Sequence, residues 1–185
     1  MKLFGKTISN QAMLATMATI VSVCALGVSL MQTYYQHKYL HAAAWAHLQI
    51  EPFRTENNID STKNIMEIKL YNKGVGPAII ESVTYRYKVK TYNSIQKLVE
   101  DIIMEGSKGK VQYQASFQEL ISGGVIAQNE EIVHASIQGA SSSRLFNEAL
   151  PKIKTRIVYS SVHEQRWEYL TGSEYANGQK TNKLN

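Results

Sequence analysis

The chain contains one cysteine, Cys24, and only three prolines among its 185 residues. A single cysteine excludes an intrachain disulfide and any zinc site built from paired cysteines. Cys24 also lacks the small preceding residue that marks a lipid-attachment site, and the apolar run continues past it. A domain of about 145 residues buries enough surface to fold without a disulfide, so the cysteine content leaves the cellular compartment open.

Charged side chains and proline are absent from residues 12–31. As an α-helix rising about 1.5 Å per residue, this stretch reaches about 30 Å, the thickness of a bilayer's hydrocarbon core. Because water cannot pair with backbone groups there, a helix is the conformation that can cross. We predict a transmembrane helix over residues 12–36 that acts as a signal anchor. A cleaved signal peptide is the alternative, but the apolar run is longer than the usual signal core and the small residues 42–44 lie well beyond it.

Lysines are distributed unequally around this helix. Lys2 and Lys6 precede it, whereas Lys38 alone follows closely. By the positive-inside rule we predict a cytoplasmic N-terminus, an inner-membrane location, and a domain in the periplasm or outside the cell. Tyr34 and Tyr35 follow the apolar run, which is typical of side chains in the headgroup layer.

Small side chains recur along one face of the helix at alternating spacings of three and four residues. They are Ala15, Ala18, Ser22, Ala25 and Ser29, here called the seam. Such a seam lets a second helix approach closely. We interpret it as a surface for self-association or for docking on another membrane helix. Because small residues are common in membrane helices, a chance pattern is the alternative.

The net charge of the chain is modest. The formal charge of +5 includes the three lysines that flank the helix, and beyond them 17 Lys and Arg accompany 15 Asp and Glu. A nearly balanced domain has no electrostatic basis for binding nucleic acid. We therefore expect a membrane and a protein, and no nucleic acid, as partners.

Alternating polar and apolar residues dominate the rest of the chain. The alternation predicts strands over residues 47–53, 66–71, 80–89, 131–137, 152–161 and 166–170. Turn signals separate these strands about every ten residues, and prolines are few. The pattern predicts a mainly β fold, an antiparallel β-sandwich or barrel. A helical bundle is the least compatible alternative.

Helical periodicity appears twice among the strands. Apolar residues follow one another at helical spacing in the set Ile95, Leu98, Val99, Ile102 and Ile103. Ser94 or Asn93 would cap this helix. A second short helix is predicted over residues 144–150, with Ser143 as its N-cap and Pro151 as its stop. We expect both helices to be inserted between strands and to cover a sheet edge or end.

These elements give a predicted domain organisation. It comprises a cytoplasmic N-terminus (1–11), the transmembrane helix (12–36), a juxtamembrane stalk (37–46), a β-sandwich domain (47–170) and a tail (171–185). The tail is polar and shows no periodicity, so we expect it to be disordered.

The predicted strand at residues 66–71 ends in a segment whose residues each have a backbone role. Gly74 and Gly76 can adopt positive φ, and Pro77 fixes its own φ. Asn72 can hydrogen-bond a nearby main-chain group. We predict a tight corner between two strands. The glycine spacing does not predict phosphate binding, because a third glycine is missing and a strand follows.

Residues 70–80 read Leu-Tyr-Asn-Lys-Gly-Val-Gly-Pro-Ala-Ile-Ile. This stretch resembles the Leu-x-Asn-x-Gly-x-Gly-Pro-Ala-x-Ile corner of small bacterial single-pass membrane-anchored proteins, most of which have no assigned function. The resemblance is strong over these residues and looser over the order of anchor and strands. It implies an immunoglobulin-like β-sandwich in which Asn72, Gly74, Gly76 and Pro77 are structural. It implies no catalytic residues.

Reactive side chains do not form a recognisable catalytic pattern. Ser160 and Ser161 lie close to His163, but the Gly-x-Ser-x-Gly context of a nucleophile is missing. His37 and His41 share a helix face and could bind a transition metal, although juxtamembrane histidines are more often interfacial polar groups. We therefore expect no enzyme activity, no metal and no cofactor.

Adjacent carboxylates occur at Glu100 with Asp101 and at Glu130 with Glu131. Each pair is typical of a solvated helix face or a turn. An acid–base pair is the alternative role that paired carboxylates can have.

Two predicted strands carry cations at alternate positions. The first has Arg86, Lys88 and Lys90, and the second has Lys152, Lys154 and Arg156. If the strands are neighbours, six cations share one sheet face, which would bind an anionic lipid, a glycan or an acidic protein. Ordinary solvation is the alternative, since exposed strands use Lys to prevent unwanted pairing.

Together these features lead us to expect a non-enzymatic interaction or adaptor module of the bacterial envelope. A protein partner or self-association would supply its function. The alternative is a membrane-bound ligand sensor whose binding changes the packing of the seam. An envelope hydrolase is a third and weaker possibility, because no nucleophile or metal set is recognisable.

Overall fold

The structure is a computed structural model that describes residues 2–3, 6–7, 10–57, 59–60, 63–109, 111–175 and 178–184. Its internal contacts divide the chain into two separate compact units. These are residues 1–42 and residues 43–185.

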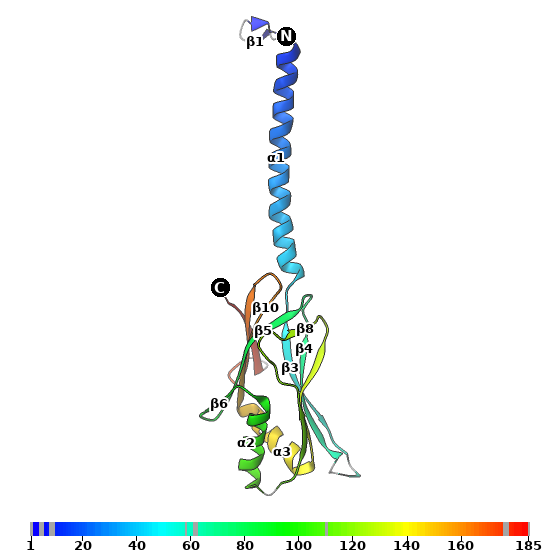
Figure 1. Ribbon diagram of the computed structural model, residues 1–185, viewed down its shortest axis with the longest axis vertical. Coiled ribbons are helices and arrows are strands. Elements are labelled where there is room, and N and C mark those ends of the chain that lie inside the picture. Colours follow the sequence, from blue (N-terminus) through cyan, green and yellow to red (C-terminus); the bar gives the residue numbers. More distant parts are fainter. Residues whose placement is uncertain are drawn as a thin grey trace. The chain divides into compact units, whose positions relative to one another are not determined.

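The first unit consists mainly of one helix, α1 (Asn10–Ala43), drawn in blue in Figure 1. Its 34 residues reach about 51 Å, so it exceeds the hydrocarbon core and includes most of the expected stalk. Residues 10–40 are long and apolar enough to cross a bilayer, which confirms the candidate N-terminal span. Two short strands, β1 (Lys2–Leu3) and β2 (Lys6–Thr7), pair before it, and the remaining residues of the predicted N-terminal segment before Asn10 lie outside the described part.

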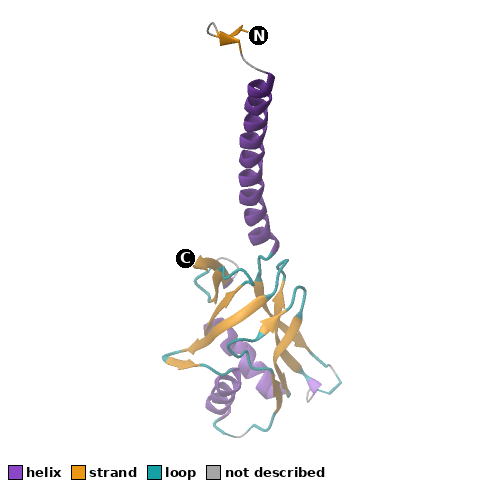
Figure 2. Ribbon diagram, turned by 45° about the horizontal axis from the view of Figure 1, so that its top comes forward, coloured by secondary structure: helices purple, strands orange, loops and turns teal. Residues whose placement is uncertain are grey.

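The second unit contains two antiparallel sheets (Figures 1 and 2). The larger sheet has the order β12 (Gln179–Leu184), β11 (Arg166–Thr171), β10 (Ile153–Ser160), β5 (Ala78–Tyr87) and β6 (Lys90–Tyr92), with β8 (Val125–Ile126) also paired to β5. The smaller sheet has the order β3 (Leu48–Thr55), β4 (Ile65–Asn72), β9 (Glu131–Gln138) and β7 (Gln114–Phe117).

Both sheets contribute to a single hydrophobic core. Leu70 of β4 and Ile137 of β9 are buried in the same cluster as Ile80 of β5 and Ile157 of β10. In β4 every second residue is buried, because alternate side chains of a strand point to opposite faces. The structure therefore confirms an antiparallel, mainly β domain with two sheets. Each predicted strand begins and ends within two residues of an observed one.

Two helices pack at the end of this domain that lies away from residues 44–47 (Figure 1). Helix α2 (Ile95–Ser107) buries all five apolar residues predicted for it, and the Ser94 side chain accepts a hydrogen bond from Lys97 N. Helix α3 (Ala140–Ala149) begins three residues before the predicted N-cap, Ser143, which is buried inside it. Gly139 occupies the cap position instead. A short 3₁₀ turn, Leu150–Lys152, leads into β10.

The predicted disordered tail is wrong over residues 179–184, which form strand β12. It pairs along the whole of β11, from Thr171 opposite Gln179 to Arg166 opposite Leu184. The strand contains almost no apolar residues, so no periodicity marks it in the sequence. Its pairing depends on backbone groups at the edge of β11, which are invisible to a hydropathy pattern. Residues 176, 177 and 185 lie outside the described part.

Strand β3 forms an edge of the smaller sheet, and the larger sheet covers that edge. The Tyr169 hydroxyl accepts a hydrogen bond from Ile50 N at 2.8 Å, and the Tyr159 hydroxyl interacts with the backbone of Leu48. Pro52, two residues further on, has no N–H to donate. Much of this edge is therefore closed to pairing with another strand.

Candidate functional site

Asn72, at the end of β4, is completely buried at the centre of the corner. Its Nδ2 donates to the carbonyls of Gly76 at 2.8 Å, Ile126 at 3.1 Å and Ala127 at 3.2 Å. Its Oδ1 accepts from Gly74 N at 3.1 Å and His47 N at 3.2 Å. One amide therefore joins the corner (residues 72–78), the segment before β3 and the connection from β8 to β9.

The two glycines of the corner serve a purpose different from the predicted one. Neither Gly74 nor Gly76 has positive φ. Instead, the backbone of residues 44–47, here called the entry segment, approaches them closely. A Cβ at Gly74 would lie 2.5 Å from His47 N, and one at Gly76 would lie 2.6 Å from the carbonyl carbon of Ala44. Glycine is required because any side chain would displace the entry segment.

Backbone hydrogen bonds fasten the entry segment to the same corner. Lys73 N donates to His47 O at 2.8 Å, and both Val75 N and Gly76 N donate to Trp45 O, at 2.9 and 3.0 Å. The domain is thus held firmly at the residues that directly follow α1. The Nδ1 atom of His47 is buried without a hydrogen-bond partner among the described residues. Burial and the nearby charge of Lys73 lower the pKa of His47 and keep the ring neutral.

Exposed apolar side chains gather at this end of the domain, on its loops and on the short strand β8. Trp45, Val75, Val125 and Val162 are between 43% and 59% exposed, which leaves them available to a partner. The strand register brings their loops together: Ile79 lies opposite both Ser160 and Val125, and Val75 N bonds to Trp45 O. Apolar side chains grouped in this way are typical of interaction surfaces.

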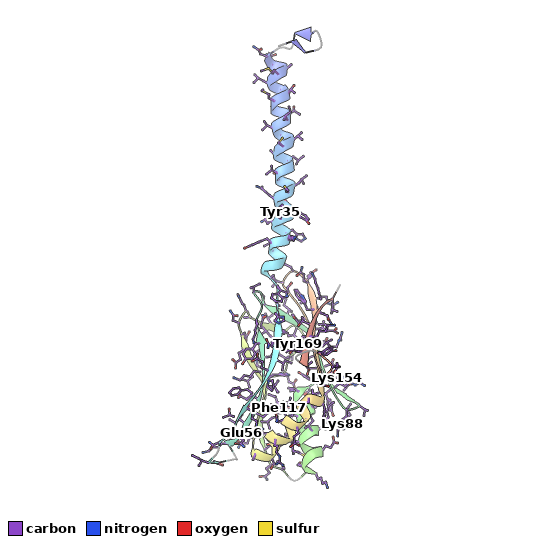
Figure 3. All side chains as sticks on the ribbon, turned by 180° about the vertical axis from the view of Figure 1, so that it is seen from behind. Tyr35, Glu56, Lys88, Phe117, Lys154 and Tyr169 are labelled. Carbon is purple, nitrogen blue, oxygen red and sulfur yellow. The ribbon has the colours of Figure 1, made fainter. Side chains whose placement is uncertain are left out.

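A cavity of about 510 Å³ lies at the other end of the domain, among β3, β10, α2, α3 and the hairpin of β11 and β12. Its walls are largely apolar and include Ile50, Ile68, Leu98, Phe146, Leu150 and Ile153. The exposed or half-exposed lining residues mark its open side. They include Glu51 and Pro52 on β3, Pro151 before β10, and Ser173, Gly178 and Gln179 on the hairpin. Figure 3 shows Tyr169, which joins these two rims, beside the cyan strand β3.

A histidine and a tyrosine form the polar part of the cavity wall and link the two sheets. His134 of β9 and Tyr85 of β5 are buried, and His134 Nε2 lies 2.5 Å from the Tyr85 hydroxyl. His134 Nδ1 lies 2.6 Å from Gln118 O. A carbonyl only accepts, so Nδ1 carries the proton and Nε2 accepts from Tyr85. Burial lowers the pKa of His134 and raises that of Tyr85, so both groups are neutral.

Glu119 lies beside this pair and holds the start of α2. Burial opposes its ionisation, but hydrogen bonds from Ser94 Oγ at 2.6 Å and from two helix amides outweigh burial and lower the pKa of Glu119. A carboxylate at the N-terminus of a helix is also favoured by the helix dipole. Glu119 therefore acts as a structural cap for α2.

The strands that carry the predicted cations are neighbours, with Arg86 directly opposite Lys154. Lys88 and Lys90, however, do not share the outward face of Arg86. They pair with Glu105 and Asp101 of α2. This difference arises because the chain turns at Lys88 and pairs Lys90 with the inward-facing Tyr87.

Acidic side chains neutralise most of this predicted patch. Besides the two lysines paired with α2, Lys154 pairs with Glu174 at 2.6 Å and Arg156 with Glu168. Figure 3 shows Lys88 and Lys154 at the outside of the domain. Only Arg86 and Lys152 have no ion pair within the described part of the chain. The patch therefore presents much less free positive charge than six cations would.

All five seam residues lie within α1 with exposed side chains. The Ser22 hydroxyl donates to Ala18 O at 2.8 Å within its own helix. Thr19, beside the seam, donates to Ala15 O in the same way. The seam therefore offers a second helix close packing of small side chains, and its Ser22 proton is already engaged.

The remaining reactive residues have local structural contacts. Ser161 is buried in the turn between β10 and β11, where its Oγ accepts from His163 N. Asp101 pairs with Lys90, and the Glu131 carboxylate pairs with Lys69 at 2.6 Å. The side chain of His41 lies outside the described part, so its expected position on the same helix face as His37 stays a prediction. Glu100 accepts a hydrogen bond from Gln96, and Glu130 accepts one from Ala127 N.

Sequence reasoning missed the cavity and the His134–Tyr85 pair. A signal for the pair exists, because His134 occupies an apolar position in the alternation of β9. The cavity has no such signal, since its walls come from elements far apart in the sequence.

No family model, curated protein or solved structure matches the chain. The features of the chain that bear on function are the span, the fastened entry segment, the exposed apolar residues beside that segment and the cavity.

Proposed function

We propose that this protein is a non-enzymatic, membrane-anchored interaction module of the bacterial envelope. The observation that carries the proposal is the direct succession of a helix able to span a bilayer and an entry segment fastened to its domain. The corner and the two antiparallel sheets support an immunoglobulin-like sandwich. The lysine distribution supports a cytoplasmic N-terminus and an external domain.

The orientation can be tested by labelling single cysteines in a Cys24→Ser background. An impermeant maleimide added to spheroplasts should label Lys180→Cys in the domain and should leave Lys6→Cys unlabelled until the membrane is opened. The reverse pattern would place the domain in the cytoplasm and overturn this part of the proposal.

The exposed loop residues at the entry segment support a protein partner that binds this end of the domain. Docking there would bury Trp45, Val75, Val125 and Val162 together, and apolar burial is the main favourable term in most protein association. An anionic partner is less well supported, because most of the cations are already paired.

A pull-down of the full-length protein in mild detergent tests this surface. The double variant Val125→Asp/Val162→Asp should lose most of a stoichiometric partner, because two charges would be buried in the contact. The control is Val89→Asp, an exposed valine in the turn after β5. Equal recovery by all three proteins would reject this surface as the docking site.

The seam supports association of the membrane helix, either with itself or with a partner helix. Ser22→Leu/Ala25→Leu should abolish crosslinked dimers or partner complexes in membranes, because the backbones could no longer approach. Cys24→Leu/Gly27→Leu adds similar bulk off the seam and is the matched control. Unchanged crosslinking in the seam variant would remove helix association from the proposal.

A second candidate function, ligand sensing, is favoured by the cavity. It is far larger than a packing defect and opens beside the hairpin of β11 and β12. In this role the domain would bind a small molecule, and the fastened entry segment would connect that event to α1.

A further inference from the structure

The cavity has the size of a ligand site. Well-packed protein interiors leave few voids larger than a water molecule, whose share of liquid volume is about 30 Å³. A volume of about 510 Å³ lies within the range of about 300–1,000 Å³ found for small-molecule pockets. The volume is therefore large enough to accept a small-molecule ligand.

The deep polar groups of the cavity need no ligand. His134 and Tyr85 satisfy each other and Gln118 O, as described above. Thr155 N donates to Thr171 Oγ1 at 2.9 Å. A polar group pushed into this part would find its potential partners engaged and would lose its hydration. The buried portion of a ligand must therefore be apolar.

The open side has a different character. Its polar side chains are Ser173, Gln179 and the carboxylate of Glu51, which pairs with Lys73 at 2.7 Å. None of the described lining residues is Lys or Arg. An anionic headgroup would meet a carboxylate there without a lining cation, whereas a hydroxyl or amide headgroup could hydrogen-bond to the serine and glutamine.

We propose that the cavity binds an uncharged amphiphile, with an aliphatic body among Ile68, Leu98 and Phe146 and a hydroxyl or amide head near Ser173 and Gln179. This inference rests on the second candidate function, ligand binding by the domain. It is independent of association through the seam.

The test uses the full-length protein in nanodiscs and two photoreactive probes with the same lauroyl chain. One is a diazirine-bearing glycerol monoester and the other is the corresponding free fatty acid. After irradiation, labelled peptides are mapped by mass spectrometry. The monoester should label peptides that contain residues 50–52, 146–153 or 171–173, in addition to any labelling of α1 from the bilayer. It should exceed the fatty acid there about tenfold, which corresponds to about 1.4 kcal/mol.

Two variants separate cavity binding from nonspecific labelling. Ser173→Trp fills the open side and should reduce cavity labelling about tenfold, whereas Lys180→Trp adds the same side chain to an exposed site on β12 and should not. Ile50→Trp, at a half-buried wall residue beside the β3 rim, provides a second blocking variant. Unreduced labelling in both blocking variants would show that the probe does not enter through this opening and would overturn the proposal.

The outcomes distinguish ligand binding by the domain from the choice of headgroup. Labelling of α1 alone would overturn both the cavity site and the ligand-sensing function. Equal cavity labelling by the two probes, or preference for the fatty acid, would keep ligand sensing and overturn the uncharged headgroup.

Discussion

The two ends of the domain are built in opposite ways. At the entry segment, one buried amide makes five hydrogen bonds, and two glycines let backbones approach to van der Waals contact. At the helical end, α2 and α3 close over a cavity of about 510 Å³. The first end therefore admits one arrangement of the chain, whereas the second has room for a ligand to change its packing.

This difference suggests a separate role for each end of the domain. The hydrogen bonds of Asn72 favour a single geometry, because each broken bond leaves a buried group unsatisfied. An apolar cavity imposes no such geometry. We infer that the corner holds the domain on the residues that follow α1, while recognition of small molecules belongs to the other end.

The largest expected effect is at Asn72. Asn72→Ala would remove all five of these hydrogen bonds, which link the corner to His47, Ile126 and Ala127, and we expect a loss of about 4 kcal/mol in the free energy of unfolding. Both tryptophans, Trp45 and Trp167, lie in the domain, so urea unfolding of the full-length protein in micelles can be followed by their fluorescence.

The control for this prediction is Asn93→Ala, an exposed asparagine in the loop before α2, which should change stability by less than about 0.5 kcal/mol. Similar stability of the two variants would mean that the corner does not fasten the domain. The two ends of the domain would then not differ in how firmly they are fixed.

The corner also shows what could and could not be predicted from the sequence. Its location and its structural character follow from local residue types, as do most strands and the buried face of α2. The reason for its glycines does not, because the close approach involves Ala44 and His47, about thirty residues earlier. Local patterns predict backbone conformation, whereas contacts between distant segments depend on the complete fold.

The same distinction explains the elements that were missed. Strand β12 contains polar residues and exists only because β11 offers an edge. The cavity is enclosed by strands, helices and a hairpin that the sequence separates by more than a hundred residues. For the candidate site, the residue types could therefore be read from the sequence. Which of those residues lie together around the cavity could not.

A smaller effect is expected at the rim of the cavity, at Tyr169. Tyr169→Phe removes the acceptor for Ile50 N and the donor to Gln179 Oε1, which lies 2.5 Å away. We expect a loss of about 1.5 kcal/mol in the free energy of unfolding, together with aggregation from the uncovered β3 edge. Tyr71→Phe removes a hydroxyl without a described hydrogen bond and is the control. Light scattering and urea unfolding measure both effects, and equal behaviour of the two variants would contradict the prediction.

His134 should make the stability of the helical end dependent on pH. Burial lowers its pKa in the folded protein below the ordinary value of about 6.5, so below that pH the unfolded chain binds more protons. The contribution of His134 to the free energy of unfolding should be constant above about pH 7 and should fall as pH drops through 6.5 toward the folded pKa. Glu119 and Asp101, whose pKa values are lowered, act only below about pH 4.5.

The histidine variant isolates this contribution. His134→Gln should be less stable at pH 8 but should show a smaller slope between pH 6.5 and 5 in urea unfolding. Some slope should remain, because the pKa of His47 is also lowered. A His134→Gln slope equal to that of the original protein would show that this histidine is not buried neutral.

The smallest effect is expected on the outward face of the larger sheet, which belongs to neither end. Arg86→Gln/Lys152→Gln should weaken retention on an immobilised polyanion such as heparin by only about twofold, since two exposed cations contribute little at moderate salt. Asp101→Asn/Glu105→Gln releases Lys88 and Lys90 from their partners and should strengthen retention instead. If the first variant abolished binding of the anionic probe, the paired acids would not neutralise the patch. Anionic recognition would then become a third function beside the fastened corner and the cavity.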